Sequence, residues 1–456
     1  MRYLPILLAG RPSLRRFRAV RNPSRSGGRR QSVTLSVAIV LVTGAAVVQS
    51  GAPPRMGSTP FDGRTAAGRT IAARTMTVPV DGPAAQTVAI EGMAYPNPLR
   101  RDNGDAVATA ADWEGARRAE LLAEFRQNVY GQGLPDAPAP TFKLASTEFP
   151  GVVRKVVRIT VAGPSGNGSF TLTLFVPKGA TKPRGTFLMI DHRGTVGDDP
   201  TRSSGYAPVP TILKAGYAFA SFKVAEIAPD SRSTYRSKMI SLFHPADQAL
   251  PDNAGRAISA WAWAASRAMD YLQTDPDIDP TKVAVIGHSR GAKTALWAGA
   301  RDPRFAAAIS NDSGSTGAKL ARRGDGGVGA QTVAGSNNAF PHWYPPTYKA
   351  YNNRVRDLPV DQHELLALMA PRRVVIASAT QDTHSDPQGE FLAYLAAAPV
   401  YELYGLGDTG LPSSTWQPRV GQGFRGPAMS YHLRSGGHGL TASDWGIYLS
   451  GDLFSR

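Results

Sequence analysis

Residues 283–300 restrict the possible fold of this chain strongly. A short apolar run at 283–286 is typical of a buried strand, and the alanine-rich segment 291–301 is typical of a helix. Between them, Gly287-His288-Ser289-Arg290-Gly291 fits the pattern G-x-S-x-G. In this context the pattern predicts a sharp turn that lifts the Ser289 hydroxyl to the end of a sheet, above the free N–H groups of a helix N-terminus. The alternative is an ordinary strand-to-helix turn in which the serine only caps the helix.

The segments around this turn alternate between strand and helix patterns. Short apolar runs suit buried strands, and longer amphipathic stretches separate them. The runs lie at 186–190, 217–222, 305–310 and 373–379, and the helical stretches at 111–128, 254–273, 360–369 and 386–397. Strands that alternate with helices favour a mainly parallel sheet covered on both faces. We therefore expect an α/β class, specifically the α/β-hydrolase fold, with helices on both faces of its central sheet.

An antiparallel hairpin is expected on the N-terminal side of that sheet. Residues 152–162 and 169–177 alternate apolar and polar side chains, and the glycine-rich turn GPSGNG separates them. Residues 96–456 as a whole are expected to form the folded domain. Residues 53–95 are rich in proline, glycine and alanine, which predicts a linker.

The beginning of the chain has the order of an export signal. The formal net charge is +16, and nine arginines without any acidic residue lie within residues 1–30. An apolar stretch follows at 33–48 and small residues at 50–52. We expect residues 1–52 to direct export to the periplasm or the medium, or to remain as a membrane anchor. That uncleaved segment would be the only membrane contact.

The remaining composition excludes several classes of function. After the leader, no dense Lys/Arg stripe with interleaved aromatic residues follows, which argues against a nucleic-acid partner. The chain has no cysteine, so disulfides, thiolate catalysis and zinc–sulfur sites are excluded. An activated serine needs no metal or cofactor for acyl transfer, and we expect neither. The sequence does not fix the oligomeric state, and a monomer is favoured.

His438 is the predicted base for Ser289. In this fold the chain order is serine, acid, histidine, with the histidine in a late loop. His438 stands in the glycine-rich loop SGGHG, just before a last helix expected at 441–450. His363 falls in a helical run and His432 in an apparent strand, which favours structural roles, whereas His384 stays open as an alternative base.

Two aspartates compete for the third position of the triad. Asp382 follows the apolar run 373–379, the usual acid position of this fold, and Asp312 follows the earlier run 305–310. The acid must orient the imidazole and balance its developing charge. Asp386 is a weaker candidate, because it is also placed to cap the next helix. We favour Asp382 and keep Asp312 as the alternative.

From about residue 97 onward, the sequence resembles the bacterial glucuronoyl esterases of carbohydrate esterase family 15. The resemblance covers nearly the whole chain after the leader. The strings that carry it are VIGHSRGAKTALWAGARDPRFAAAISNDSG, NNAFPHWY, LPVDQHELLALMAPRRVVIASA, AAPVYELYG and SGGHGLTASDW. They are long and specific, far beyond a shared serine turn.

The resemblance implies a serine carboxylic-ester hydrolase that acts on plant cell-wall carbohydrate. Its substrate would be the 4-O-methyl-glucuronoyl ester that links xylan to lignin alcohols. The family's S-R-x-x-K element falls on Ser289, Arg290 and Lys293. In the family the arginine helps stabilise the oxyanion and the lysine binds sugar hydroxyls. Trp343 matches a position near the sugar site, where a flat ring would pack against a sugar face; plain core packing is its alternative.

Two departures from the family pattern leave other functions open. Asp312 stands where the family commonly has glutamate, and Thr383-His384 replaces a tryptophan that often follows the later acid. An acetyl xylan or polysaccharide esterase is therefore one alternative. The other is a catalytically inactive, hydrolase-like protein that binds carbohydrate.

Overall fold

The computed structural model describes residues 87–136, 138–179, 181–324, 329–411, 419–451 and 453–454. The predicted export segment 1–52 and most of the predicted linker lie outside these residues. The last residues of that linker form part of a two-stranded antiparallel sheet, β1 (Thr87–Ile90) and β2 (Met93–Pro96). Part of the segment that composition alone assigned to the linker therefore forms a strand.

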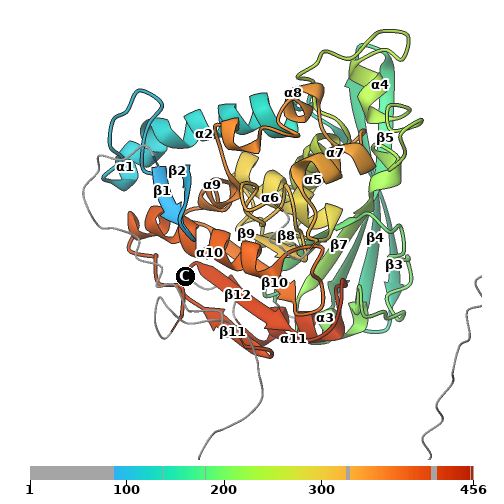
Figure 1. The fold of residues 1–456 in the computed structure, drawn as a ribbon. Helices are drawn as coiled ribbons and strands as arrows, with labels where there is room; N and C mark the ends of the chain where they lie inside the picture. The colour runs from blue at the N-terminus through green and yellow to red at the C-terminus, as the bar shows by residue number, and fades with distance from the viewer. Residues whose placement is uncertain are drawn as a thin grey trace, which may run out of the picture. The chain divides into compact units, whose positions relative to one another are not determined.

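A ten-stranded sheet organises the described part of the chain (Figure 1). In spatial order it comprises β11 (Gln422–Arg425), β12 (Met429–Arg434), β10 (Arg373–Ala379), β9 (Ala307–Asn311), β8 (Val283–His288), β6 (Thr186–Asp191), β7 (Ala218–Lys223), β5 (Gly166–Pro177), β4 (Val152–Gly163) and β3 (Thr141–Phe149). The strands from β12 to β7 are parallel, and β11, β5, β4 and β3 pair antiparallel. The carboxyl ends of six strands consequently lie along one edge.

Helices cover both faces of this sheet, as the alternating pattern predicted. One face packs against α5 (Ala257–Leu272), α6 (Arg290–Arg301), α9 (Gln362–Ala367) and α10 (Pro387–Glu402), and the other against α3 (Val209–Lys214) and α11 (Ala442–Ser450). Side chains alternate between the two cores along each strand: on β6, Leu188 and Ile190 join one core and Phe187 and Met189 the other. Both predictions, the α/β-hydrolase fold and the β4–β5 hairpin, are confirmed.

The remaining helices are short or irregular. The helix expected at 111–128 runs as α1 (Ala110–Asp112), a π-helical stretch (Trp113–Arg117), α2 (Arg118–Phe125) and a second π-helical stretch (Arg126–Tyr130). The others are α4 (Met239–Phe243), α7 (Val333–Ala339), α8 (Pro346–Lys349) and two 3-10 turns (Val224–Glu226 and Val355–Asp357). Across the described ranges, none of the helices has the length and apolar character needed to cross a membrane.

Local capping explains where the helices near the sheet edge begin. Asp386 accepts a hydrogen bond from Gly389 N–H at 3.1 Å and so caps α10, with Pro387 at the first helical position. This is the role that the sequence offered for Asp386 as an alternative to catalysis. Thr441 and Asp444 form a capping box at the start of α11, directly after the loop that carries His438.

Candidate active site

The turn between β8 and α6 has the strained geometry that the G-x-S-x-G pattern predicts. Ser289 adopts φ 55° and ψ −124°, a conformation that L side chains rarely take. Its N–H donates to Asn311 O at 2.9 Å on the neighbouring strand β9, which holds the turn against the sheet. Ser289 O accepts from Ala292 N–H and Lys293 N–H at 2.9 and 3.1 Å, so helix α6 starts immediately after the serine.

The two glycines of the motif permit a close approach of strand and helix. A Cβ at position 287 would lie 2.1 Å from Gly291 O, and a Cβ at position 291 would lie 3.0 Å from Ile190 O. A side chain at position 287 would require the backbone to move, and one at position 291 would make an unusually tight contact. The motif therefore has a steric cause here: only glycine allows α6 to begin so close to β8 and β6.

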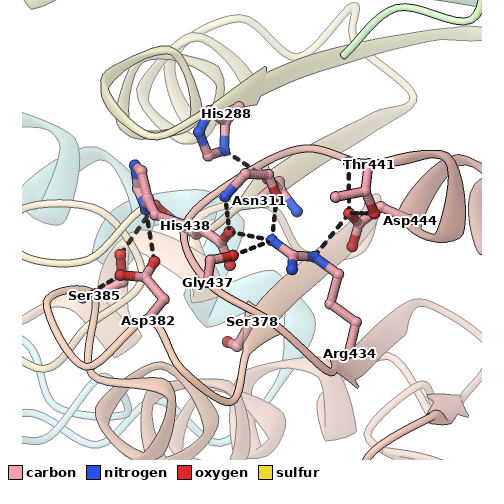
Figure 2. Close-up of polar contacts among 12 residues, drawn as sticks. His288, Asn311, Ser378, Asp382, Ser385, Arg434, Gly437, His438, Thr441 and Asp444 are labelled. Atoms are coloured by element: carbon pink, nitrogen blue, oxygen red, sulfur yellow. Dashed lines mark hydrogen bonds and ion pairs between the residues drawn. The ribbon is translucent and has the colours of Figure 1, made fainter. Parts of the chain in front are cut away.

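His438 and Asp382 form a hydrogen-bonded pair at the same edge of the sheet (Figure 2). His438 Nδ1 donates to Asp382 Oδ2 at 2.6 Å; the Asp382 side chain is 2% exposed and that of His438 is 39% exposed. Burial opposes ionisation of Asp382, but the hydrogen bonds from His438 and Ser385 outweigh it and lower the pKa of this carboxyl. The acid therefore stays ionised and fixes the imidazole with its other nitrogen, Nε2, free to act.

The two loops that supply this pair are tied to each other. Thr380 N–H donates to Arg434 O at 3.0 Å, and Gln381 N–H donates to Gly436 O at 2.9 Å. These bonds continue the parallel pairing of β10 with β12 into the loops beyond it. The separation between Asp382 and His438 is thus set by backbone hydrogen bonds.

His438 also lies against the serine turn. Its ring centroid is 4.5 Å from that of His288, the residue before Ser289. Among the described residues, no hydrogen bond joins Ser289 Oγ to His438. Such bonds are often long in unliganded hydrolases and tighten when substrate binds. The structure brings the serine turn and the histidine to one place, as the sequence predicted.

His288 is buried and uncharged beside the serine turn. Its Nδ1 donates to Asn311 Oδ1 at 2.7 Å, and burial lowers the pKa of His288 to about 2. His192, after β6, lies across from it with ring centroids 5.9 Å apart, and burial, with the charges of Arg290 and Arg193, lowers the pKa of His192 to about 3. Both rings are uncharged near neutral pH and line the serine turn without competing for its proton.

Asp312 lies beside the pair but bonds to other groups. Its Oδ2 accepts from Arg434 Nη2 at 2.8 Å and from Gly439 N–H at 3.0 Å. Burial raises the pKa of Asp312 to about 8, although the hydrogen bond from Gly439 N–H and the charge of Arg434 act to lower it. Of the two acids that the sequence left open, Asp382 contacts the imidazole, and Asp312 contacts the loop that carries it.

One ligand atom each of Asp312, Asp382 and His438 lie within 4.8 Å of one another, a spacing that a metal ion could use. The partners of these atoms argue for a different use. Asp312 already pairs with a guanidinium, and His438 Nδ1 donates its proton to Asp382. A cation there would face the charge of Arg434 and displace that proton. The cluster fits an acid–base pair better than a metal site.

Arg290 directly follows Ser289 as the first residue of α6. Its guanidinium pairs with Asp230 and lies over the rings of Phe340 and Trp343, 5.1 and 4.8 Å from their centroids. Burial opposes ionisation of Asp230, but hydrogen bonds from His342 and Trp343 and the charge of Arg290 lower the pKa of this carboxyl. A fixed cation therefore lies next to the serine turn.

Trp343 and Lys293 are buried. The Trp343 side chain is 2% exposed, its Nε1–H donates to Asp230 Oδ1 at 2.7 Å, and Phe340 stacks on it at 3.7 Å. Phe340 is the more exposed ring of this stack. Lys293 Nζ donates to Ser313 O and Ser315 O at 2.5 Å and to Gln331 Oε1 at 3.3 Å, and burial lowers its pKa to about 7. Lys293 thus holds the backbone of Ser313 and Ser315, and Trp343 supports Phe340.

The other histidines lie as their sequence context indicated. His432 is buried on β12 and donates to Asp444 Oδ1 at 2.9 Å, and His363 is buried on α9. His384 is exposed on the loop after Asp382. Partial desolvation and the nearby charges of Lys293 and His438 lower the pKa of His384, and the hydrogen bond to Asp382 comes from His438.

Asp230, Arg434 and Glu390 were not predicted from the sequence. Asp230 bonds Arg290 from 60 residues away, and Arg434 bonds Asp312 from 122 residues away. Glu390 accepts from Gly314 N–H at 2.8 Å and from Ser378 Oγ at 2.6 Å. Arg434 did carry a signal, since it directly precedes the histidine loop at the end of a strand. Nothing local marked the other two.

Comparisons with known proteins agree with this geometry. The family model "Glucuronyl esterase, fungi" matches residues 157–405. Carbohydrate esterase MZ0003 of an unknown prokaryotic organism is 36% identical over 392 residues, covering 78% of this chain and 88% of the relative. A 4-O-methyl-glucuronoyl methylesterase 1 of Wolfiporia cocos is 30% identical over 322 residues, covering 69% and 72%. The structure of a glucuronoyl esterase from Solibacter usitatus superposes with a TM-score of 0.71 at 36% identity, covering 79% and 98%.

Proposed function

Since this chain belongs to the glucuronoyl esterases of carbohydrate esterase family 15, we propose that it hydrolyses 4-O-methyl-glucuronoyl esters between xylan and lignin alcohols. Its relatives include carboxylic ester hydrolases named for the methyl ester of that sugar acid. The observation that carries the proposal is the strained Ser289 turn with the His438–Asp382 pair beside it.

The proposed reaction is a two-step acyl transfer. His438 Nε2 takes the proton of Ser289 Oγ, and the oxygen attacks the ester carbonyl. The tetrahedral intermediate collapses when the C–O bond to the alcohol breaks and His438 returns the proton to that alcohol. Water, deprotonated by His438, then attacks the acyl-serine and releases the glucuronic acid and the serine hydroxyl. Asp382 holds the imidazole and balances its charge in both steps.

The oxyanion is proposed to be stabilised from the start of α6. Arg290 is the first residue of that helix, so its backbone N–H has no partner within the helix. Its guanidinium adds a fixed cation, which Asp230 and the Phe340–Trp343 stack hold in position. Lys293 is proposed to act on the sugar side through the loop 313–315 that its Nζ holds, and Trp343 through Phe340, which it supports.

The test compares benzyl glucuronate with an aryl acetate and an acetylated xylan, using the wild type and Ser289→Ala. We expect release of benzyl alcohol by the wild type and a loss of about 10⁴-fold or more in kcat/KM in the variant. Activity on the acetylated xylan alone would select a polysaccharide deacetylase. No activity on any ester would favour a carbohydrate-binding protein.

We also propose that residues 1–52 direct export, since the substrate is a wall polymer outside the cell. The basic and apolar order of this segment supports the proposal. The mass and N-terminal sequence of protein recovered from the host distinguish the outcomes. A chain that starts close to residue 53 in the periplasm or medium supports export. A full-length chain in the membrane fraction would instead mean an anchor.

A further inference from the structure

Arg434, at the end of β12, makes most of the side-chain contacts that shape the loop carrying His438 (Figure 2). Its Nη1 donates to Ser435 O at 3.0 Å, and its Nη2 donates to Gly437 O at 2.9 Å and to Gly439 O. The carbonyls on both sides of His438 are therefore bonded to one guanidinium. A planar fork of donors suits this arrangement, whereas a single ammonium group does not.

The loop needs such an external constraint because of its composition. Three of the five residues 435–439 are glycines, and Gly436 adopts φ +97°. Glycine gives a chain the largest conformational freedom to lose, so this loop has little intrinsic preference for one conformation. His438 is also 39% exposed, which means that side-chain packing alone does not fix it.

The guanidinium itself is held from two directions. Nη2 lies 2.8 Å from Asp312 Oδ2, and Nε lies 2.9 Å from Asp444 Oδ2. Asp312 Oδ2 also accepts from Gly439 N–H at 3.0 Å, so it bonds the same loop directly. Arg434 is 6% exposed, and both carboxylates are fully buried. These side chains form one buried, hydrogen-bonded cluster next to the His438–Asp382 pair.

We propose that Arg434 is a positioning residue for catalysis, which fixes the loop 435–439 so that His438 meets both Asp382 and Ser289. Asp312 acts indirectly, through its contacts with Arg434 and Gly439. The proposal rests on the proposed function, because it assigns work to a residue that holds the proposed base. Arg434 does not itself touch the reacting atoms. Without it the folded protein still binds substrate, but the imidazole spends only part of its time in the productive geometry.

The test measures kcat and KM separately for Arg434→Gln and Arg434→Lys with benzyl glucuronate. We expect kcat to fall about 10²-fold in Arg434→Gln, while KM stays close to that of the wild type, because misplacement of a catalytic group affects the transition state. Arg434→Lys keeps the charge beside Asp312 and Asp444, but its single nitrogen replaces Nη1, Nη2 and Nε, so it cannot reach Ser435 O, the carbonyls of Gly437 and Gly439, and Asp444 at once. It should fold as the wild type does and still lose about tenfold in kcat.

Arg372→Gln is the matched control. Like Arg434, Arg372 is buried, with 9% of its surface exposed, and it donates to backbone carbonyls, those of Asp302, Phe305 and Leu368. It differs in position, because it lies just before β10 at the opposite edge of the sheet. It should lower the melting temperature and leave kcat per folded molecule unchanged. If Arg434→Gln fails to fold, the Arg434→Lys variant decides.

The proposed role of Arg434 would be overturned if Arg434→Lys kept the wild-type kcat. It would also be overturned if the kcat of the Arg434 variants per folded molecule matched that of Arg372→Gln. His438→Ala separates this result from a failure of the proposed function. If His438→Ala is inactive while both Arg434 variants keep wild-type kcat, only the positioning role is wrong. If His438→Ala keeps its activity, the proposed base itself is wrong.

Discussion

Asp382 and Asp312 lie side by side, within 4.8 Å of each other and of the His438 ligand atom, but they are in opposite electrostatic situations. Hydrogen bonds from His438 and Ser385 lower the pKa of Asp382 against the effect of burial, whereas burial raises that of Asp312 to about 8. An acid that stabilises an imidazolium must be ionised at working pH, and the contact and the pKa both favour Asp382.

The first prediction separates these two acids. The amide of Asp382→Asn carries no charge, so it neither holds His438 in the tautomer with a proton on Nδ1 nor balances the charge of the imidazolium. We expect kcat for benzyl glucuronate to fall by about 10³–10⁴-fold. Asp312→Asn keeps an oxygen for Gly439 N–H and Arg434 and should lose about tenfold. The opposite ranking of the two variants would assign the acid to Asp312.

Single residues were predictable where local context restricts them. Ser289 and His438 each follow a strand that ends at the same edge, so fold type and chain order were enough to predict both. The same reasoning left Asp382 and Asp312 open, because both aspartates follow strands that end there. Asp230 contributes through partners far away in sequence, and no local pattern indicates them, whereas Arg434 was marked only by its place before the histidine loop. Lys293 and Trp343 were predicted to meet the sugar, but their side chains are 3% and 2% exposed. The family resemblance assigned both residues to the sugar site, and that role stays a prediction.

At the scale of elements, the junction of β8 and α6 is the part that tolerates least change. Helix and strand backbones approach so closely at Gly287 that a Cβ there would meet both the carbonyl carbon and the oxygen of Gly291 within 2.2 Å. A methyl group must push α6 away from β8. The Ser289 turn and the first N–H groups of the helix would move with it.

The second prediction follows from that contact. Gly287→Ala should destabilise the protein by about 1–3 kcal/mol or more through overpacking and reduce esterase activity strongly. Gly446→Ala is the control, because Gly446 is an exposed position of α11 with no atom within 4 Å of an added Cβ. Alanine there should raise stability by about 0.5–1 kcal/mol. Thermal unfolding of both variants measures the difference, and an active Gly287→Ala of wild-type stability would contradict the steric account.

Buried elements were easier to predict than exposed ones. The strands β6, β8, β9 and β10 are buried on nearly every residue, and each stood out as an apolar run. By contrast, β3 is exposed at most positions along Thr141–Phe149 and carries no clear alternation. It forms because the hairpin strand β4 offers it an edge to pair with, and that requirement lies outside its own sequence. The hairpin β1–β2, most of which lies inside the predicted linker, was also not predicted, because each of its strands depends on pairing with the other.

At the scale of the whole molecule, buried charge beneath the site links stability to pH. Glu390 is fully buried in the first turn of α10, and burial raises its pKa to about 7 against hydrogen bonds from Ser378, Gly314 and Ser313. The native state therefore holds a proton that the unfolded chain releases near its ordinary pKa of 4.5. The stabilising contribution is complete below about pH 4.5 and is lost as the pH rises through about 7.

The third prediction uses a neutral replacement of this acid. Glu390→Gln can keep an oxygen toward Gly314 N–H and place its amide toward Ser378 Oγ. Relative to the wild type, the variant should gain melting temperature on the order of a few degrees as the pH rises from 4.5 to 7. Burial lowers the pKa of Lys293 to about 7, so the contribution of this residue to stability rises with pH above that value, opposite to that of Glu390. A constant difference between the two proteins across pH 4.5–7 would show that Glu390 does not titrate there.

Covalent labelling tests the central claim, that Ser289 is a nucleophile activated by His438. A fluorophosphonate should add one phosphonyl group to the wild type, on the tryptic peptide 283–290 that carries Ser289. The label should be absent from Ser289→Ala and form far more slowly in His438→Ala. Ester hydrolysis without a label on this peptide, or a label on another serine that is lost together with activity, would contradict the account.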